Sequence, residues 1–244
     1  MRNIIIWIRS ILFFITFYVW SAFILLLFSW TLLFPEKVVI YAAVIWCKGA
    51  RVLLDWVAGI KVDIKGLENL PKENGYIVAS KHQSAMETVI FHSFLPNTIY
   101  VMKKSLFFIP LGGLYFWLSG CIAVDRKKGT SSLRKMFTMA KDRLSKGFNI
   151  VIFPEGTRTP PGATPKYNPG LAMIYEAVQA PVIPVALNTG YFWPKNSVKR
   201  YPGTATIEFL PAIKPGLEKR EFMKTLQDQI ESAIVIPNND LTKK

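Results

Sequence analysis

Polar residues are rare over the first sixty positions, and no charged residue occurs in the 25 positions from Ser10 to Phe34. As a helix, this run would be about 37 Å long, whereas the hydrocarbon core of a bilayer is about 30 Å thick. A cleaved signal peptide has a shorter apolar region followed by a small-residue cleavage site, and neither feature is present. Aromatic residues leave the helix without a polar face, so lipid suits it better than a protein core. The pattern therefore predicts a membrane-binding helix.

A second helical segment is expected from Lys37 to Ile60, and Pro35 allows a turn between the two. Either the first helix spans the membrane and the second lies at its interface, or the two form a hairpin within one leaflet. Of the 30 Lys and Arg residues, 28 follow position 35. The positive-inside rule then places the bulk of the chain on the cytoplasmic side of the cell (inner) membrane. We expect residues 1–60 to be N-terminal membrane-anchoring helices.

After Ile60 the pattern changes to short β-branched runs separated by helical stretches. The predicted strands are Lys61–Lys65, Tyr76–Ser80, Thr98–Met102, Cys121–Asp125, Asn149–Phe153, Val182–Leu187 and Thr204–Phe209. The predicted helices are Ser84–Leu95, Leu111–Ser119, Ser131–Lys146, Pro169–Val178 and Leu217–Ile234. This alternation predicts an α/β domain over residues 61–236, with a mixed, largely parallel sheet covered by helices, and a frayed tail over 237–244.

Composition narrows the class of protein. A hydrophobic content of 51% excludes intrinsic disorder. A net charge of +14 on so apolar a chain favours an anionic membrane surface or a phosphate-bearing lipid over nucleic acid. Two cysteines exclude a disulfide framework, and two histidines leave no plausible zinc site. The dinucleotide fingerprint, the P-loop and the G-x-S-x-G nucleophile elbow are all absent from the sequence.

The first candidate for chemistry follows the strand predicted to end at position 80. Histidine titrates near neutral pH, so His82 at a strand end is a natural general base. Glu87 could hold the other ring nitrogen, as in a catalytic dyad. The stretch Ser84–Glu87 is also an S-x-x-E capping box, in which Glu87 would bond the backbone of Ser84. Spacing alone leaves dyad and cap as equal alternatives, whereas His92, in mid-helix, is expected to be packed or exposed rather than catalytic.

Basic residues gather after several predicted strands. Residues 101–160 hold 11 Lys or Arg and 3 Asp or Glu, a surplus of +8. Lys103 and Lys104 follow one strand, Arg126 follows the next, and Arg158 lies in the loop after a third. Open α/β sheets bind anionic ligands at the carboxyl ends of their strands. The alternative for each residue is a solvated surface charge.

The loop Phe153–Arg158, with the sequence FPEGTR, combines groups that suit a phosphate ester. Gly156 permits close backbone approach, Thr157 offers a hydroxyl, and Arg158 is a two-pronged donor. Glu155 could orient Arg158, bind a substrate hydroxyl, or pair with a nearby cation as structural support.

The stretch Val182–Asn188 is predicted to be a buried strand that contains Pro184. Proline lacks an N–H group, so it suits an edge strand or a bulge, and bulges are common beside active sites.

Taken in order, four stretches resemble the four sequence blocks of the glycerolipid acyltransferases, in particular the lysophosphatidate (1-acyl-sn-glycerol-3-phosphate) acyltransferase type. They are His82–Glu87, Gly120–Arg126, Phe153–Arg158 and Val182–Asn188. The resemblance covers about residues 60–215, and FPEGTR is its most specific string. The first block departs from the family, which usually has Asn before the histidine and Asp five positions after it. Here these positions are Lys81 and Glu87.

The resemblance implies acyl transfer from acyl-CoA or acyl carrier protein to the free 2-hydroxyl of lysophosphatidate, which gives phosphatidate. It implies that His82 removes the hydroxyl proton for direct attack, without an acyl-enzyme, and that Glu87 orients His82. Arg126 and Arg158 would hold the phosphate, with Lys104 a weaker candidate, and Glu155, Gly156 and Thr157 would shape the glycerol site. The partners would be membrane phospholipids and these substrates, with no resident cofactor, metal or nucleic acid.

Three other functions compete with this one. A membrane-associated thioesterase or lipase would need a nucleophile beside His82, and Ser84 is the only obvious one. A non-enzymatic lipid-binding protein would have no need of a His–acid pair. A nearer alternative keeps the acyl transfer but uses another lysolipid as acceptor.

Overall fold

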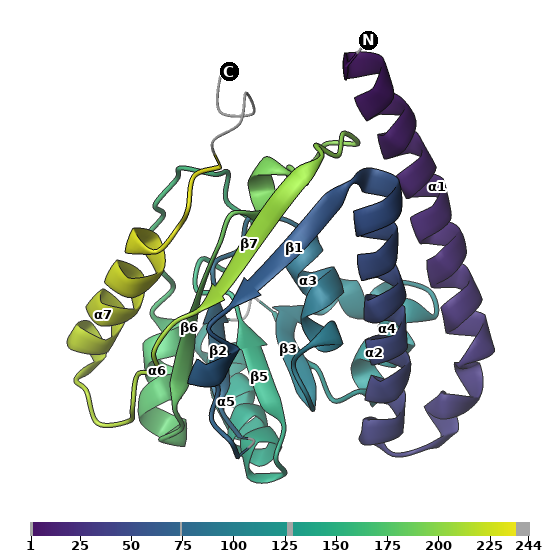
Figure 1. Ribbon diagram of the computed structural model, residues 1–244. Helices are drawn as coiled ribbons and strands as arrows, with labels where there is room; N and C mark the ends of the chain where they lie inside the picture. The colour runs from purple at the N-terminus through teal and green to yellow at the C-terminus, as the bar shows by residue number, and fades with distance from the viewer. Residues whose placement is uncertain (1, 74, 126–128, 238–244) are drawn as a thin grey trace.

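The computed structural model describes residues 2–73, 75–125 and 129–237. Its centre is a seven-stranded sheet with the strand order β1-β7-β6-β2-β5-β3-β4 (Figure 1). The strands are β1 (Ile60–Lys65), β2 (Ile77–Ser80), β3 (Thr98–Lys103), β4 (Ile122–Val124), β5 (Asn149–Ile152), β6 (Val182–Leu187) and β7 (Gly203–Phe209). All these neighbours pair in parallel except β6 and β7. The predicted α/β class and the mixed, largely parallel sheet are confirmed.

Helices cover both sides of this sheet (Figure 1). They are α1 (Arg2–Leu27), α2 (Glu36–Leu53), α3 (Met86–Ile90), α4 (Gly112–Leu118), α5 (Gly129–Ser145), α6 (Gly170–Val178) and α7 (Lys219–Ser232). The prediction of one long helix over Ser84–Leu95 is wrong, because α3 ends at Ile90 and continues only as a 3-10 turn over Phe91–Ser93. The chain must reverse into β3 here. Pro96 disfavours helical backbone at the residue before it, and Asn97 has a left-handed φ of 44°.

Pro184 lies inside the sheet, so the edge-strand interpretation is wrong: β6 has β7 on one side and β2 on the other. The bulge interpretation fits instead. Val182 pairs with Ile213 and Val185 pairs with Phe209, so three steps along β6 are matched by four steps on the opposing chain. Between these pairs the carbonyl of Pro184 accepts the N–H of Leu210 at 2.9 Å. The missing proline N–H thus falls where the ladder is already irregular.

The first two helices lie side by side, with the chain reversing between them (Figure 1). In α1, Asn3–Leu27 is long and apolar enough to cross a membrane, with a mean hydropathy of 2.3. Most of its large apolar side chains are exposed, whereas Phe13 is buried in the same core as the sheet. From α2, Ile40 and Ala50 join that core as well. The expected boundary at residue 60 marks a change of sequence pattern, while the core is continuous across it. Of the expected frayed tail, 238–244 lie outside the described residues.

The strand order brings the candidate residues to one end of the sheet. β2 and β5 are parallel neighbours, with Val78 opposite Val151, so the segments that follow them are adjacent. β3 lies on the other side of β5, and β4 lies beside β3. The carboxyl ends of these four strands therefore meet.

Candidate active site

His82 lies two residues after β2, and its ring is held on two sides. Its Nδ1 is 2.9 Å from Oε1 of Glu87, and its ring stacks on Phe153 with centroids 3.9 Å apart. The side chain is 15% exposed. Because an ionised carboxylate can only accept, Nδ1 carries the proton in this pair, and Nε2 keeps its lone pair.

Glu87 makes both of the contacts that the sequence leaves as alternatives. Besides His82, its Oε1 accepts the backbone N–H groups of Gln83 at 2.8 Å and Ser84 at 2.7 Å. Its Oε2 accepts the hydroxyl of Thr189 at 2.8 Å. The side chain is fully buried, and these donors stabilise it as a carboxylate. The Glu87 carboxylate therefore fixes the backbone at Gln83 and Ser84 and also orients the His82 ring.

Ser84 is built into the backbone rather than placed as a nucleophile. It is fully buried, and its hydroxyl donates to the carbonyl of Trp193 at 2.6 Å while accepting the N–H of Met86 at 3.1 Å. A nucleophilic serine must give its proton to the histidine. The geometry of Ser84 gives no support to the lipase alternative.

A cavity of about 480 Å³ lies at this end of the sheet. His82, Gly156, Thr157 and Arg158 are among its lining residues, together with Lys103. The apolar part of the lining includes Val101, Met102, Leu106, Phe116, Leu133, Met136, Phe153, Leu171 and Ile174. A site with this mixture of walls fits an amphiphile, with a charged head and an apolar chain.

A second cavity, of about 170 Å³, shares part of this lining and extends to the N-terminal helices. Trp46 and Tyr100 line both cavities, and the second is also lined by Ile24 of α1 and by Val39 and Ala42 of α2. The apolar side of the site is therefore adjacent to a second cavity lined by the N-terminal helices.

The FPEGTR loop is a tight turn. The N–H of Gly156 donates to the carbonyl of Phe153 at 2.9 Å, and Gly156 has a φ of 68°, a conformation that favours glycine. The turn leaves Thr157 exposed and Arg158 partly exposed at the cavity. Its far end is fixed to the histidine segment, because the N–H of Thr159 donates to the carbonyl of His82 at 2.8 Å.

Glu155 turns the other way from its neighbours in the loop. Its side chain is 1% exposed, its Oε1 accepts the N–H of His82 at 3.2 Å, and Nζ of Lys81 lies 3.6 Å from the same oxygen. Burial raises the pKa of the Glu155 carboxyl. Among the described residues that line the cavity, Glu155 does not appear. Of the three interpretations of this residue, the structure favours pairing with a cation as structural support.

Lys104, one of the predicted phosphate ligands, is not among the described residues that line the cavity. The side chain of Lys104 is half-exposed and its Nζ lies 3.6 Å from Oδ2 of Asp125, whereas its neighbour Lys103 lines the cavity. Arg126 lies outside the described residues. Lys103 was visible in the sequence only as one of several basic residues after a strand.

His92 is packed, in agreement with the packed interpretation. It is buried, its Nε2 lies 2.9 Å from the carbonyl oxygen of Thr98, and burial lowers its pKa to about 4. Within the part of the chain that the structure describes, no group of three or more His, Cys, Asp or Glu side chains could hold a metal ion.

Comparison with known proteins agrees with this geometry. A family model described as Acyltransferase matches residues 61–188. The 1-acyl-sn-glycerol-3-phosphate acyltransferase of Pseudomonas aeruginosa is 37% identical over 168 residues, which cover 69% of this chain and 65% of that protein. The enzyme of the same name from Borreliella burgdorferi is 31% identical, with 72% of each chain covered.

Among solved structures, the 1-acyl-sn-glycerophosphate (LPA) acyltransferase from Thermotoga maritima has the same fold. The TM-score is 0.77, at 24% identity, over 95% of both chains. Three of the four sequence blocks contribute to the cavity lining, with His82, Val124 and Arg158 as examples, whereas no residue of Val182–Asn188 is among the described lining residues. The family model matches more than half of the chain, and a relative is 37% identical. The chain belongs to the acyltransferase family.

Proposed function

We propose that this chain transfers an acyl group from an acyl thioester to the 2-hydroxyl of lysophosphatidate and so forms phosphatidate. The observation that carries the proposal is the His82–Glu87 pair at a cavity whose lining combines Arg158 with apolar walls. The 37% identity to the P. aeruginosa acyltransferase supports the same substrate class.

His82 acts as the general base in this proposal. Glu87 holds the proton on Nδ1, so Nε2 takes the proton of the acceptor hydroxyl as its oxygen attacks the thioester carbonyl. The carbon–sulfur bond then breaks, and the thiolate takes the proton back from Nε2. Such general base catalysis contributes about 10²–10⁴-fold to the rate. No acyl-enzyme forms, because the oxygen of the lysolipid is itself the nucleophile.

Arg158 and Lys103 bind the phosphate from the cavity wall, and Gly156 and Thr157 lie against the glycerol. Arg126, from the second sequence block, and Lys104, a basic residue after β3, remain further candidates for the phosphate. The donor, acyl-CoA or acyl carrier protein, is a substrate, and the reaction uses no resident cofactor or metal.

The exposed apolar side of α1 supports a location at a membrane. That this is the cell (inner) membrane, with the catalytic domain on the cytoplasmic side, rests on the 28 of 30 basic residues that follow position 35. A lipid acceptor can then reach the site from surrounding phospholipids. The second cavity, lined from α1 and α2, offers apolar space beside the site for an acyl chain.

The direct test is to incubate purified protein in detergent micelles with acyl-CoA or acylated carrier protein and a panel of lysolipids, with products identified by mass spectrometry. We expect phosphatidate from lysophosphatidate with at least one donor. Acylation of another lysolipid in preference would replace the acceptor in the proposal, and free fatty acid as the main product would replace transfer by hydrolysis.

Arg158→Lys tests how the phosphate is recognised. Lysine keeps the charge but loses the two-pronged donor, so we expect kcat/KM for lysophosphatidate to fall about 10- to 100-fold. Arg134→Lys, on the exposed side of α5, is the matched control and should have no effect. If the wild type uses monoacylglycerol as well as lysophosphatidate, Arg158 does not have this role.

A further inference from the structure

Lys81, one of the two residues that depart from the family pattern, is a buried lysine directly before His82. Its side chain is 1% exposed, and its Nζ donates to the carbonyl of Ala163 at 3.0 Å and to Oε1 of Glu231 at 2.6 Å. Desolvating an ammonium group is costly unless it is paired and hydrogen-bonded. Glu231 is therefore the main partner of a cation beside the candidate base.

Glu231 comes from α7, 150 positions along the chain from Lys81. Its Oε1 also accepts the hydroxyl of Tyr167 at 2.8 Å. Tyr167 follows the FPEGTR loop, and the next residue, Asn168, donates its N–H to the carbonyl of Pro154 in that loop at 2.8 Å. One carboxylate of α7 thus joins the segment before His82 to the segment after the loop.

The contact continues to His82 through Glu155. Lys81 is shared unequally between two carboxylates, with Nζ 2.6 Å from Glu231 and 3.6 Å from Glu155. Oε1 of Glu155 accepts the N–H of His82. Oε1 of Glu155 thus lies between the Lys81 ammonium and the His82 N–H, so the position in which Glu231 holds Lys81 also affects the contact with His82.

We propose that Glu231 is a positioning residue for acyl transfer: by holding Lys81, it fixes the backbone of His82 relative to the FPEGTR turn. The inference rests on the proposed function. It adds a residue of α7 to the groups that position the base, and this residue lies outside 61–188, the range that the family model matches.

The test is Glu231→Gln in the full chain, with kcat, KM and melting temperature measured together. Glutamine keeps an oxygen for Tyr167 but loses the charge, so Lys81 is drawn towards Glu155 and shifts the carboxylate that accepts the His82 N–H. We expect kcat per folded molecule to fall about tenfold with KM for lysophosphatidate within about twofold, because displacing the base affects the reaction more than binding. Glu231→Asp keeps the charge and should retain most of kcat.

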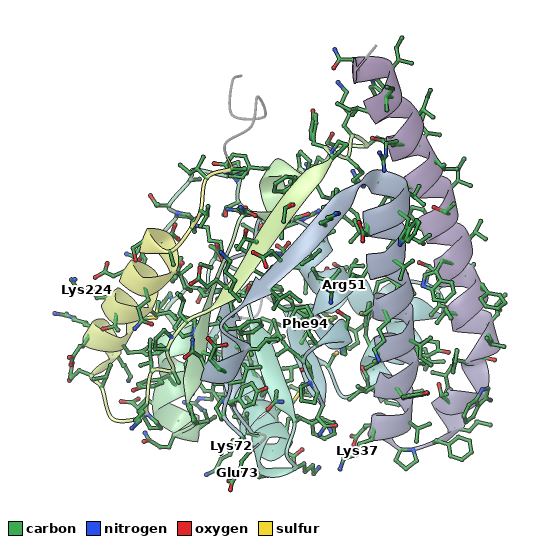
Figure 2. All side chains as sticks on the ribbon, in the orientation of Figure 1. Lys37, Arg51, Lys72, Glu73, Phe94 and Lys224 are labelled. Atoms are coloured by element: carbon green, nitrogen blue, oxygen red, sulfur yellow. The ribbon has the colours of Figure 1, made fainter. Side chains whose placement is uncertain are left out.

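Asp228→Asn is the matched control on the same helix. Asp228 pairs with Lys224 at 2.5 Å, both side chains are mostly exposed, and Lys224 extends away from the sheet (Figure 2). If Glu231→Gln does not fold, Tyr167→Phe removes one hydrogen bond to Glu231 and should lower kcat about two- to threefold with KM unchanged.

A wild-type kcat per folded molecule in Glu231→Gln, whatever its melting temperature, would show a purely structural role and overturn the inference. The same applies to Tyr167→Phe where it is the variant used. A wild-type protein that acylates no lysolipid would instead refute the proposed function, and this inference with it.

Discussion

The two histidines of this chain lie ten positions apart and have opposite surroundings. Each has one ring nitrogen 2.9 Å from an oxygen, but His82 faces the buried carboxylate of Glu87 and His92 faces the carbonyl of Thr98. His82 lines the cavity of about 480 Å³, whereas His92 lines only the smaller, mostly apolar cavity, is buried, and has its pKa lowered to about 4. A general base needs both an open nitrogen and a countercharge for the imidazolium that forms. Only the surroundings of His82 supply both.

The largest effect should come from His82→Ala. Removing the proposed base should lower kcat about 10²–10⁴-fold. The melting temperature should change little, since the side chain is partly exposed and contacts mainly Phe153 and Glu87. Turnover and thermal melting, measured on the same preparation, check this. Turnover within about tenfold of the wild type would remove the distinction between the two histidines.

Glu87→Gln should have the next largest effect, because it removes the countercharge and little else. The amide oxygen can still accept from His82, Gln83 and Ser84, and the amide nitrogen can donate to the hydroxyl of Thr189. We expect kcat to fall about 10²-fold with the fold preserved.

The same variant distinguishes two roles of the Glu87 carboxylate, which are to orient His82 and to fix the backbone. Near-wild-type turnover at an unchanged melting temperature would mean that Glu87 acts only on the backbone. Glu87→Asp, which restores the usual family residue, should keep substantial activity if the carboxylate orients His82.

Much of the fold could be predicted from the sequence, because short β-branched runs bounded by turns are a local signal. All seven predicted strands are present, and Val182–Leu187 has the predicted bounds. The helix predicted over Ser84–Leu95 fails because its length is set by the sharp return into β3. The edge position predicted for Pro184 is wrong because the order of strands in a sheet cannot be read from local sequence.

The site shows the same limit: contacts between residues close in the sequence could be predicted, whereas contacts between distant segments could not. The His82–Glu87 pair spans five positions, so its spacing could be read directly. Thr189 lies 102 positions from Glu87 and reaches it only because β6 pairs with β2. It directly follows the fourth block, which is the signal that could have identified it. For Glu231 on α7 the sequence contains no such signal.

Thr189→Val should have a moderate effect and tests how firmly the countercharge is held. Valine has the same shape, but it leaves Oε2 of a buried carboxylate without its donor, which costs about 1–3 kcal/mol. We expect a lower melting temperature and a fall in kcat of about tenfold or less. Thr138→Val, which removes an exposed hydroxyl from α5, is the matched control. Unchanged kcat would show that the contacts to Oε1 suffice.

The smallest effect on activity should come from His92→Gln, which keeps an N–H donor for the carbonyl of Thr98. At neutral pH we expect kcat within about twofold of the wild type, because His92 does not line the cavity that contains His82 and lines only the smaller one. Its effect is on stability instead. Burial lowers the pKa of His92 to about 4, against about 6.5 in the unfolded chain.

The folded state therefore favours the neutral ring, while the unfolded state binds a proton below about pH 6.5. The stabilisation from the neutral ring is complete above that pH and is lost as the pH falls towards about 4, by about 3 kcal/mol in all. Glutamine does not titrate. As the pH falls over this range, the free energy of unfolding of His92→Gln should therefore decrease less than that of the wild type. Denaturant unfolding of both proteins at several pH values measures the gap. If the difference in free energy of unfolding between the two proteins is independent of pH, the pKa of His92 is not lowered in the folded protein. Burial and the neutral acceptor would then not explain the difference between His92 and His82.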